Sequence, residues 1–128
     1  MREAVLDASV VLEWFTTRPS GARRLRAEYE SGDLAVLAPP LLHQEILNVA
    51  GRRWGWGSEA LQELAETLQD LSFDLAEPEL TAVARWVAAG LTAYDAAYVA
   101  VAEAASLPLI TRDEIILRLA PGVARPLA

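Results

Sequence analysis

The chain has 128 residues, 53% of them hydrophobic, a net charge of −7 and no cysteine. We expect a single domain over residues 1–128, since this length supports one substantial core, and the missing cysteine excludes disulfides, thiolate zinc sites and cysteine nucleophiles. Short, interrupted apolar stretches and the lack of a basic, apolar leader predict a cytoplasmic protein with no membrane span, and the acidic balance argues against a general nucleic-acid binder.

Strand-like and helix-like segments alternate along the chain. The predicted strands are residues 3–7, 34–38, 72–77, 107–111 and 122–126. The predicted helices are residues 9–15, 20–31, 40–53, 58–71, 78–90 and 92–105, with a short helix after Asp113. Helix starts are placed at Ser58, as an N-cap, and at the prolines Pro40 and Pro78, since proline is tolerated in a first turn. This alternation predicts an α/β fold with a central parallel sheet.

Four acidic residues stand where such a fold collects charge. Asp7 ends the first strand, Asp113 follows the strand at 107–111, Glu45 lies in a predicted helix, and Asp95 opens another. Parallel sheets place their sites at the carboxyl ends of strands, and helices can carry the other two acids to the same edge. Clustered carboxylates need cations, and hard oxygen ligands suit Mg²⁺ or Mn²⁺. The pattern predicts a divalent-metal pocket, with phosphodiester hydrolysis as its chemistry.

Each acid also has an ordinary structural explanation. Asp7 and Asp113 fit helix N-caps, Asp95 fits a capping box that begins at Thr92, and Glu45 fits a solvated helix position. A cap and a metal ligand do not exclude each other, so both interpretations stay open at this point. Three polar residues next to the acids are candidates for orienting a carboxylate or a metal-bound water. They are Ser9, Asn48 and Thr111.

Several other phosphate-handling folds are excluded by missing residues. All eleven basic residues are arginine, whereas receiver domains and haloacid-dehalogenase-type phosphatases need a lysine near the phosphoryl group. The Gly-Lys-Ser/Thr of a P-loop is missing as well. His43 is the only histidine, which argues against a zinc site or a Ser-His-Asp triad.

The combined pattern resembles the PIN-domain ribonucleases, and among them the VapC-type toxins of prokaryotic toxin–antitoxin pairs. The matching segments are VLDASVVLEWF, PPLLHQEILNVA and LTAYDAAYVAVAEAASLPLITRDEIILRLA. The resemblance implies a three-layer α/β/α sandwich and a pocket of Asp7, Glu45, Asp95 and Asp113 that holds Mg²⁺ or Mn²⁺. Asp7, Asp95 and Asp113 are assigned to the metal, and Glu45 to a metal-bound water.

The resemblance also implies partners. It predicts an endoribonuclease that cuts structured RNA such as transfer or ribosomal RNA, forms a homodimer and is inhibited by a cognate antitoxin. A PIN nuclease acting in RNA maturation without an antitoxin, and a catalytically silent binding module, remain as alternatives. Position 115 is isoleucine, where some relatives carry a further acid.

Few basic residues are available to meet RNA phosphates. The candidates are Arg23, Arg24, Arg52, Arg53 and Arg112. Trp54 and Trp56 follow two of them and are interpreted either as base-stacking residues or as a protein contact, with the contact favoured.

Overall fold

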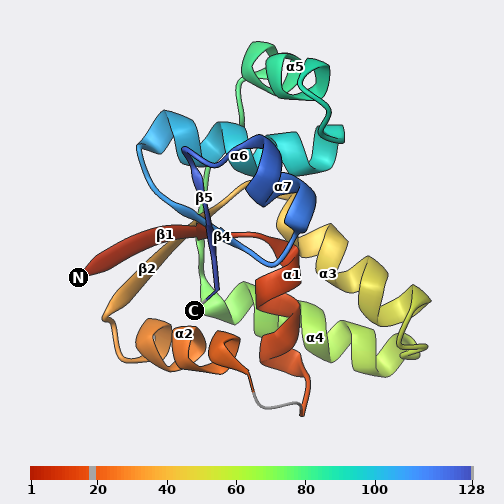
Figure 1. The fold of residues 1–128 in the computed structure, drawn as a ribbon. Helices are drawn as coiled ribbons and strands as arrows, with labels where there is room; N and C mark the ends of the chain where they lie inside the picture. The colour runs from red at the N-terminus through yellow and green to blue at the C-terminus, as the bar shows by residue number, and fades with distance from the viewer. Residues whose placement is uncertain (18–19, 128) are drawn as a thin grey trace.

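The centre of the molecule is a five-stranded parallel sheet (Figure 1). The structure is a computed structural model that describes residues 1–17 and 20–127. Its strands are β1 (Arg2–Leu6), β2 (Leu34–Ala38), β3 (Asp74–Leu75), β4 (Leu109–Thr111) and β5 (Ala124–Pro126). They lie in the order β3-β2-β1-β4-β5, and every neighbouring pair is parallel.

The strand order reverses at the middle of the sheet. The chain moves outward from β1 through β2 to β3, and then returns to the other side of β1 to form β4 and β5. Val5 in β1 therefore pairs with Leu37 of β2 on one side and with Leu109 of β4 on the other. Open α/β sheets form their binding crevice at such a reversal, outside the carboxyl ends of the strands. Here those ends lead into Asp7 and Arg112.

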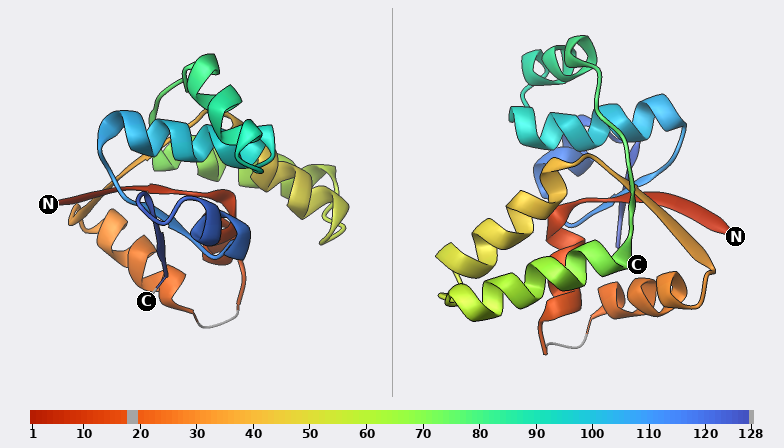
Figure 2. Two further views of the ribbon diagram at one scale, coloured as in Figure 1. Left: turned by 45° about the horizontal axis from the view of Figure 1, so that its top comes forward. Right: turned by 180° about the vertical axis from the view of Figure 1, so that it is seen from behind.

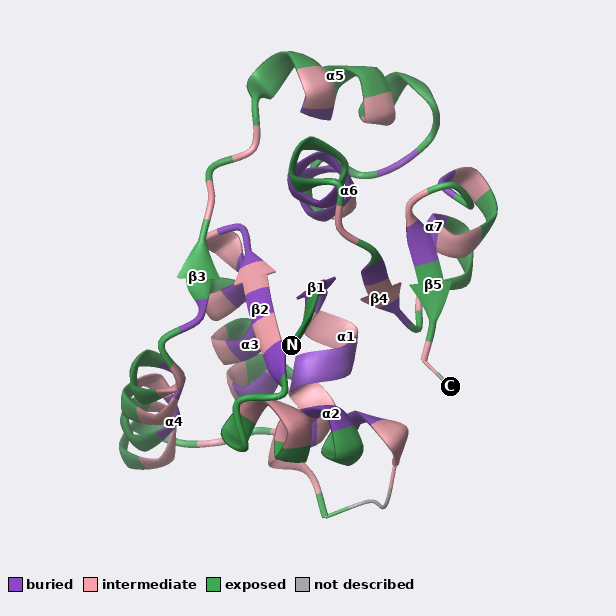
Figure 3. Cartoon of the chain, turned by 90° about the vertical axis from the view of Figure 1, so that its left-hand side faces the viewer, coloured by how far each residue is buried: buried purple, intermediate pink, exposed green. Residues whose placement is uncertain are grey.

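Helices cover both faces of the sheet, as the end-on and rotated views show (Figures 2 and 3). One face is covered by α6 (Ala93–Ala105), which contacts β1, β2 and β4 and carries α5 (Leu80–Ala88) on its outer side. The opposite face holds the short helix α1 (Ala8–Val11) against β4 and α2 (Gly21–Glu30) against β2. The remaining helices are η1 (Leu12–Phe15), α3 (Leu41–Arg52), α4 (Ser58–Leu71) and α7 (Glu114–Leu119). The predicted α/β/α sandwich is confirmed.

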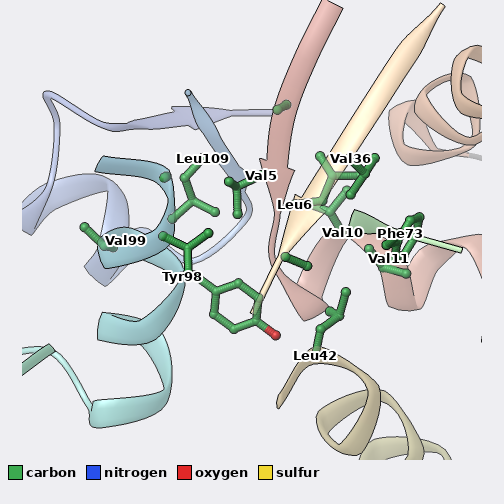
Figure 4. Packing of buried hydrophobic residues seen from close by; sticks show 14 of the residues in the cluster. Val5, Leu6, Val10, Val11, Val36, Leu42, Phe73, Tyr98, Val99 and Leu109 are labelled. Carbon is green, nitrogen blue, oxygen red and sulfur yellow. The ribbon is translucent and has the colours of Figure 1, made fainter. Parts of the chain in front are cut away.

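The core lies on both faces of the sheet, between the strands and the helices that cover them, and α6 contributes many of its residues. Alanines and valines at positions 96–102 are all buried together with Tyr98, as expected for a helix that is apolar on nearly every side. Leu6, Val10 and Leu42 close the core on the side of α1 and α3 (Figure 4). This packing fixes α6, which carries Asp95, against the central strands, and α3, which carries Glu45, against α1 and α4.

Several predicted boundaries differ from the structure, most clearly that of the strand expected at 72–77, of which only Asp74–Leu75 form β3. The first helix is α-helical only to Val11 and tightens into the 3₁₀ helix η1. Gly57, not Ser58, is the N-cap of α4, and Ser58 is its first helical residue. The chain after Pro78 stays extended at Glu79, which has a ψ of 131°, so α5 begins only at Leu80. None of these shifts moves a candidate site residue. Within the described residues, no helix is long and apolar enough to cross a membrane.

Candidate active site

Four elements bring the acids to the carboxyl edge of the sheet. Asp7 directly follows β1, and Asp113 follows β4, the neighbour of β1 at the strand-order reversal. Glu45 comes from the second turn of α3, and Asp95 from the first turn of α6. The local sequence explains the positions of the two strand-end acids, since β1 and β4 are each followed by a helix, and the N-cap of that helix is an aspartate. The capping explanation is therefore confirmed for Asp7 and Asp113, which are also the acids at the ends of two neighbouring strands.

Asp7 is the most enclosed of the four acids, with 5% of its surface exposed. Its Oδ1 accepts a hydrogen bond from the Ser9 backbone N–H at 3.0 Å and another from the Ser9 hydroxyl. Its Oδ2 accepts from the hydroxyl of Thr111, a fully buried residue of β4. Burial raises the pKa of Asp7 above its ordinary value, and the hydrogen bonds from Ser9 and Thr111 oppose that shift.

Thr111 also connects Asp7 to Asp113. Its Oγ1 accepts the Asp113 backbone N–H at 2.9 Å while its proton goes to Asp7. Asp113 Oδ1 in turn caps α7 by accepting from the N–H groups of Ile115 at 2.8 Å and Ile116 at 3.1 Å. The Oδ1 atoms of Asp7 and Asp113 and the hydroxyl of Thr111 thus all accept hydrogen bonds from backbone N–H groups. These bonds hold the two strand-end acids in one arrangement.

Glu45 and Asp95 face this pair from the two flanking helices. Burial raises the pKa of Glu45, and the negative charges of Asp95 and Asp7 raise it further. Burial also raises the pKa of Asp95, with an added contribution from Asp113. Three repulsive pairs therefore connect the four carboxylates: Glu45 with Asp95, Glu45 with Asp7, and Asp95 with Asp113. Such mutual repulsion favours either protonation or a bound cation.

Tyr98 is a member of the site that sequence reasoning missed. Its hydroxyl donates to Glu45 Oε1 at 2.6 Å. Burial, followed by the charges of Glu45, Asp7 and Asp95, raises the pKa of Tyr98, so the phenol stays protonated and acts as a donor. The sequence did contain a signal, since Tyr98 lies three residues after Asp95 and shares its helix face.

The donor set fits a hard divalent cation, although the acids do not yet converge on one point. Among residues 1–17 and 20–127, no group of three or more carboxylate, histidine or cysteine side chains is arranged to hold a metal ion as it stands. Both carboxylate oxygens of Asp7 accept hydrogen bonds, from Ser9 and Thr111, and one oxygen of Glu45 accepts a hydrogen bond from Tyr98. An all-oxygen, acidic cluster suits Mg²⁺ or Mn²⁺.

The remaining predicted residues lie at different distances from the acids. Asn48 is on an exposed part of α3, one turn beyond Glu45. Arg52 and Arg53 are exposed at the far end of that helix, about seven residues on and therefore roughly 10 Å along its axis. Ser9 and Thr111, in contrast, contact Asp7 directly.

Arg112 is next to the acids but already has a partner. Its Nη2 donates to Glu13 Oε1 at 3.1 Å, and its Nε donates to Glu13 Oε2. Its backbone N–H donates to the Ser9 hydroxyl at 3.3 Å. Glu13 had no sequence signal, because the two residues are separated by 99 positions and meet only through the pairing of β1 with β4. Arg112 must leave Glu13 before it can bind a phosphate fully.

Comparison with known proteins agrees with this geometry. The profile of the PIN domain family matches residues 4–121. The chain belongs to the PIN domain family. A similar solved structure is the crystal structure of PAE2754 from Pyrobaculum aerophilum, 28% identical, with a TM-score of 0.71 over 98% of this chain and 90% of that one. None of the curated proteins matches the sequence. PIN domains are generally nucleases that use divalent metal ions, which is the chemistry that the acidic pocket suits.

Proposed function

We propose that this PIN domain is a Mg²⁺- or Mn²⁺-dependent endoribonuclease that cuts structured RNA and serves as the toxin of a toxin–antitoxin pair. The observation that carries the proposal is that Thr111 bridges Asp7 and Asp113 at the strand-order reversal, while burial raises the pKa of Asp7, Glu45 and Asp95 and repulsion between the acids raises the pKa of the last two further. A purely structural domain gains nothing from that repulsion. The alternative of a silent binding module is therefore less well supported.

The residues take distinct roles in this proposal. Divalent ions supply a Lewis acid for the scissile phosphate and lower the pKa of water. Asp7, Asp95 and Asp113 hold the ions, while Ser9 and Thr111 keep the Asp7 carboxylate in place through hydrogen bonds. Glu45, whose raised pKa makes it a better base than an ordinary carboxylate, takes the proton from the attacking water. No side-chain nucleophile is needed.

A groove at the end of η1 supports an antitoxin partner. It has a volume of about 520 Å³ and runs between η1 and α4, with Trp14, Phe15, Trp56 and Leu64 among its lining residues. The η1 helix follows directly on α1, whose N-cap is Asp7, so the groove and Asp7 lie at opposite ends of the α1–η1 segment. An amphipathic helix seated in the groove can therefore continue to the acidic edge and place an arginine there. Trp56 packs on Trp54 with ring centroids 5.3 Å apart, which favours the protein-contact interpretation of this segment.

A homodimer is the second partner in the proposal. Leu80 and Val87 lie on α5 with 81% and 43% of their surface exposed, and the main packing partner of α5 is α6. A second copy would remove these apolar side chains from water. Light scattering of the purified chain without antitoxin tests this directly, and a monodisperse monomer at high micromolar concentration would exclude it.

The proposed activity is tested with the purified chain and a folded RNA, such as a transfer RNA. We expect discrete cuts in a loop in the presence of Mn²⁺, no cuts in excess chelator, and recovery when Mn²⁺ is restored. Added product of the neighbouring gene should suppress the cuts. Cleavage that persists in chelator would contradict the metal mechanism, whereas metal-dependent cleavage with no inhibitory partner would favour RNA maturation without an antitoxin.

A further inference from the structure

Tyr98 links the two helices that carry the flanking acids. It lies on α6, three residues after Asp95, and 1% of its surface is exposed. Its ring points from α6 into the core, with the hydroxyl turned toward α3, the helix of Leu42 and Glu45 (Figure 4). The ring is held by the same core that fixes α6 on β1 and β4. The position of its hydroxyl is therefore set by packing, not by the acids themselves.

The hydroxyl of Tyr98 has one well-formed bond. It donates to Glu45 Oε1 at 2.6 Å, across 53 positions of sequence. A buried tyrosine hydroxyl requires a partner, and a bond to a carboxylate is among the stronger types. Glu45 is only half-buried and has a flexible side chain, so this bond selects one orientation of its carboxylate. Oε2 is left available for another partner.

We propose that Tyr98 is a positioning residue: its hydroxyl fixes the Glu45 carboxylate in the orientation in which Glu45 holds a water bound to the divalent cation of Asp7, Asp95 and Asp113. This proposal rests on the proposed function and adds a residue to it. The physical reason is preorganisation, since a carboxylate held by a buried donor needs no ordering when the cation binds. Partners that orient ligands in this way typically contribute 10- to 100-fold to metal affinity.

The test uses Tyr98→Phe, which keeps the packed ring and removes only the hydroxyl. Mn²⁺ affinity is measured by calorimetry without RNA, well below the melting temperature. We expect affinity to fall by about 10- to 100-fold. With RNA and sub-saturating Mn²⁺, kcat should fall with KM for RNA unchanged. Glu45→Asp, which withdraws the carboxylate from Tyr98, should lower Mn²⁺ affinity to a similar degree. This variant replaces Tyr98→Phe in the test if Tyr98→Phe does not fold.

Two tyrosines on the same chain provide matched controls. Tyr29 donates its hydroxyl to the Leu71 carbonyl, away from the acids, and Tyr94 is exposed on α6. Tyr29→Phe and Tyr94→Phe should leave Mn²⁺ affinity within about two-fold of wild type, even if Tyr29→Phe lowers the melting temperature.

The outcomes separate this inference from the proposed function. A Tyr98→Phe protein that melts earlier but binds Mn²⁺ like wild type would show a purely structural tyrosine and overturn the inference alone. In a Glu45→Ala background, Tyr98→Phe should change Mn²⁺ affinity less than two-fold. An undiminished effect there would show that Tyr98 does not act through Glu45. A wild-type chain that binds no Mn²⁺ would instead remove the proposed function and this inference with it.

Discussion

Replacing Thr111 by valine tests whether one buried hydroxyl holds the two strand-end acids together. Valine keeps the branched shape that fills the fully buried position, so packing changes little. The substitution removes the donor to Asp7 Oδ2 and the acceptor of the Asp113 N–H, which the hydroxyl binds at 2.9 Å. Any loss of stability therefore reports on these two bonds.

The expected loss follows from the two bonds. A hydrogen bond to a charged group is worth about 1.5–3 kcal/mol, and an enclosed N–H left without a partner costs about 1–3 kcal/mol. The Asp113 N–H is only partly buried, so its share lies at the low end. We expect the free energy of unfolding to fall by about 3 kcal/mol and the melting temperature to fall by roughly 10 °C.

The measurement is urea unfolding in excess chelator at neutral pH, which keeps metal binding out of the comparison. The control is Thr67→Val, because the Thr67 hydroxyl donates to the Glu63 carbonyl at 3.1 Å on an exposed part of α4. The control should change stability by less than about 0.5 kcal/mol. A Thr111→Val protein within about 1 kcal/mol of wild type would refute the bridging role, since either bond alone is worth that much.

Three further predictions concern charge, RNA and the partner. The pKa of Asp7 is raised in the folded protein, so the metal-free wild type is most stable relative to Asp7→Asn below the ordinary carboxyl pKa of about 4. This difference in stability is lost as the pH rises through the folded pKa of Asp7. Urea unfolding from pH 4 to 8 measures it, and a difference that stays constant would contradict the prediction. Removing Arg52 and Arg53 should reduce the slope of log affinity against log salt by roughly 0.7 per arginine for single-stranded RNA, and an unchanged slope would place the RNA elsewhere. Trp56→Ala should weaken binding of the antitoxin by about 30-fold with RNA cleavage intact, and equal binding would exclude the groove.

The sequence carried most of the information on the fold because local patterns and caps agree with the packing. The buried strand that ends at Asp7 and the apolar helix after Thr92 are both found close to their predicted limits. Aspartates placed after short apolar runs predicted the helix caps at Asp7 and Asp113. The tightening of the first helix after Val11 has no comparable signal, since its residues suit either helix type.

What the sequence did not reveal depends on contacts between distant segments. The bond from Tyr98 to Glu45 requires knowing that α6 and α3 meet at the same edge, and the pairing of Arg112 with Glu13 requires the strand order. Within the apolar sequence of α6, nothing distinguishes a tyrosine that only packs in the core from one that also donates a hydrogen bond, as Tyr98 does. Arg112 was predicted to meet RNA, and that role stays a prediction, because its ion pair with Glu13 must first be displaced.

The most direct test of the acidic site compares Asp95→Asn with Asp70→Asn, since Asp70 is an exposed aspartate on α4. Single-turnover cleavage of a folded RNA is measured in Mn²⁺, with circular dichroism to establish that both variants are folded. The site predicts that Asp95→Asn loses about 100-fold or more in rate, corresponding to about 3 kcal/mol, whereas Asp70→Asn cleaves like wild type. A folded Asp95→Asn protein that cleaves the RNA at the wild-type rate would contradict the assignment of this acidic cluster as the active site.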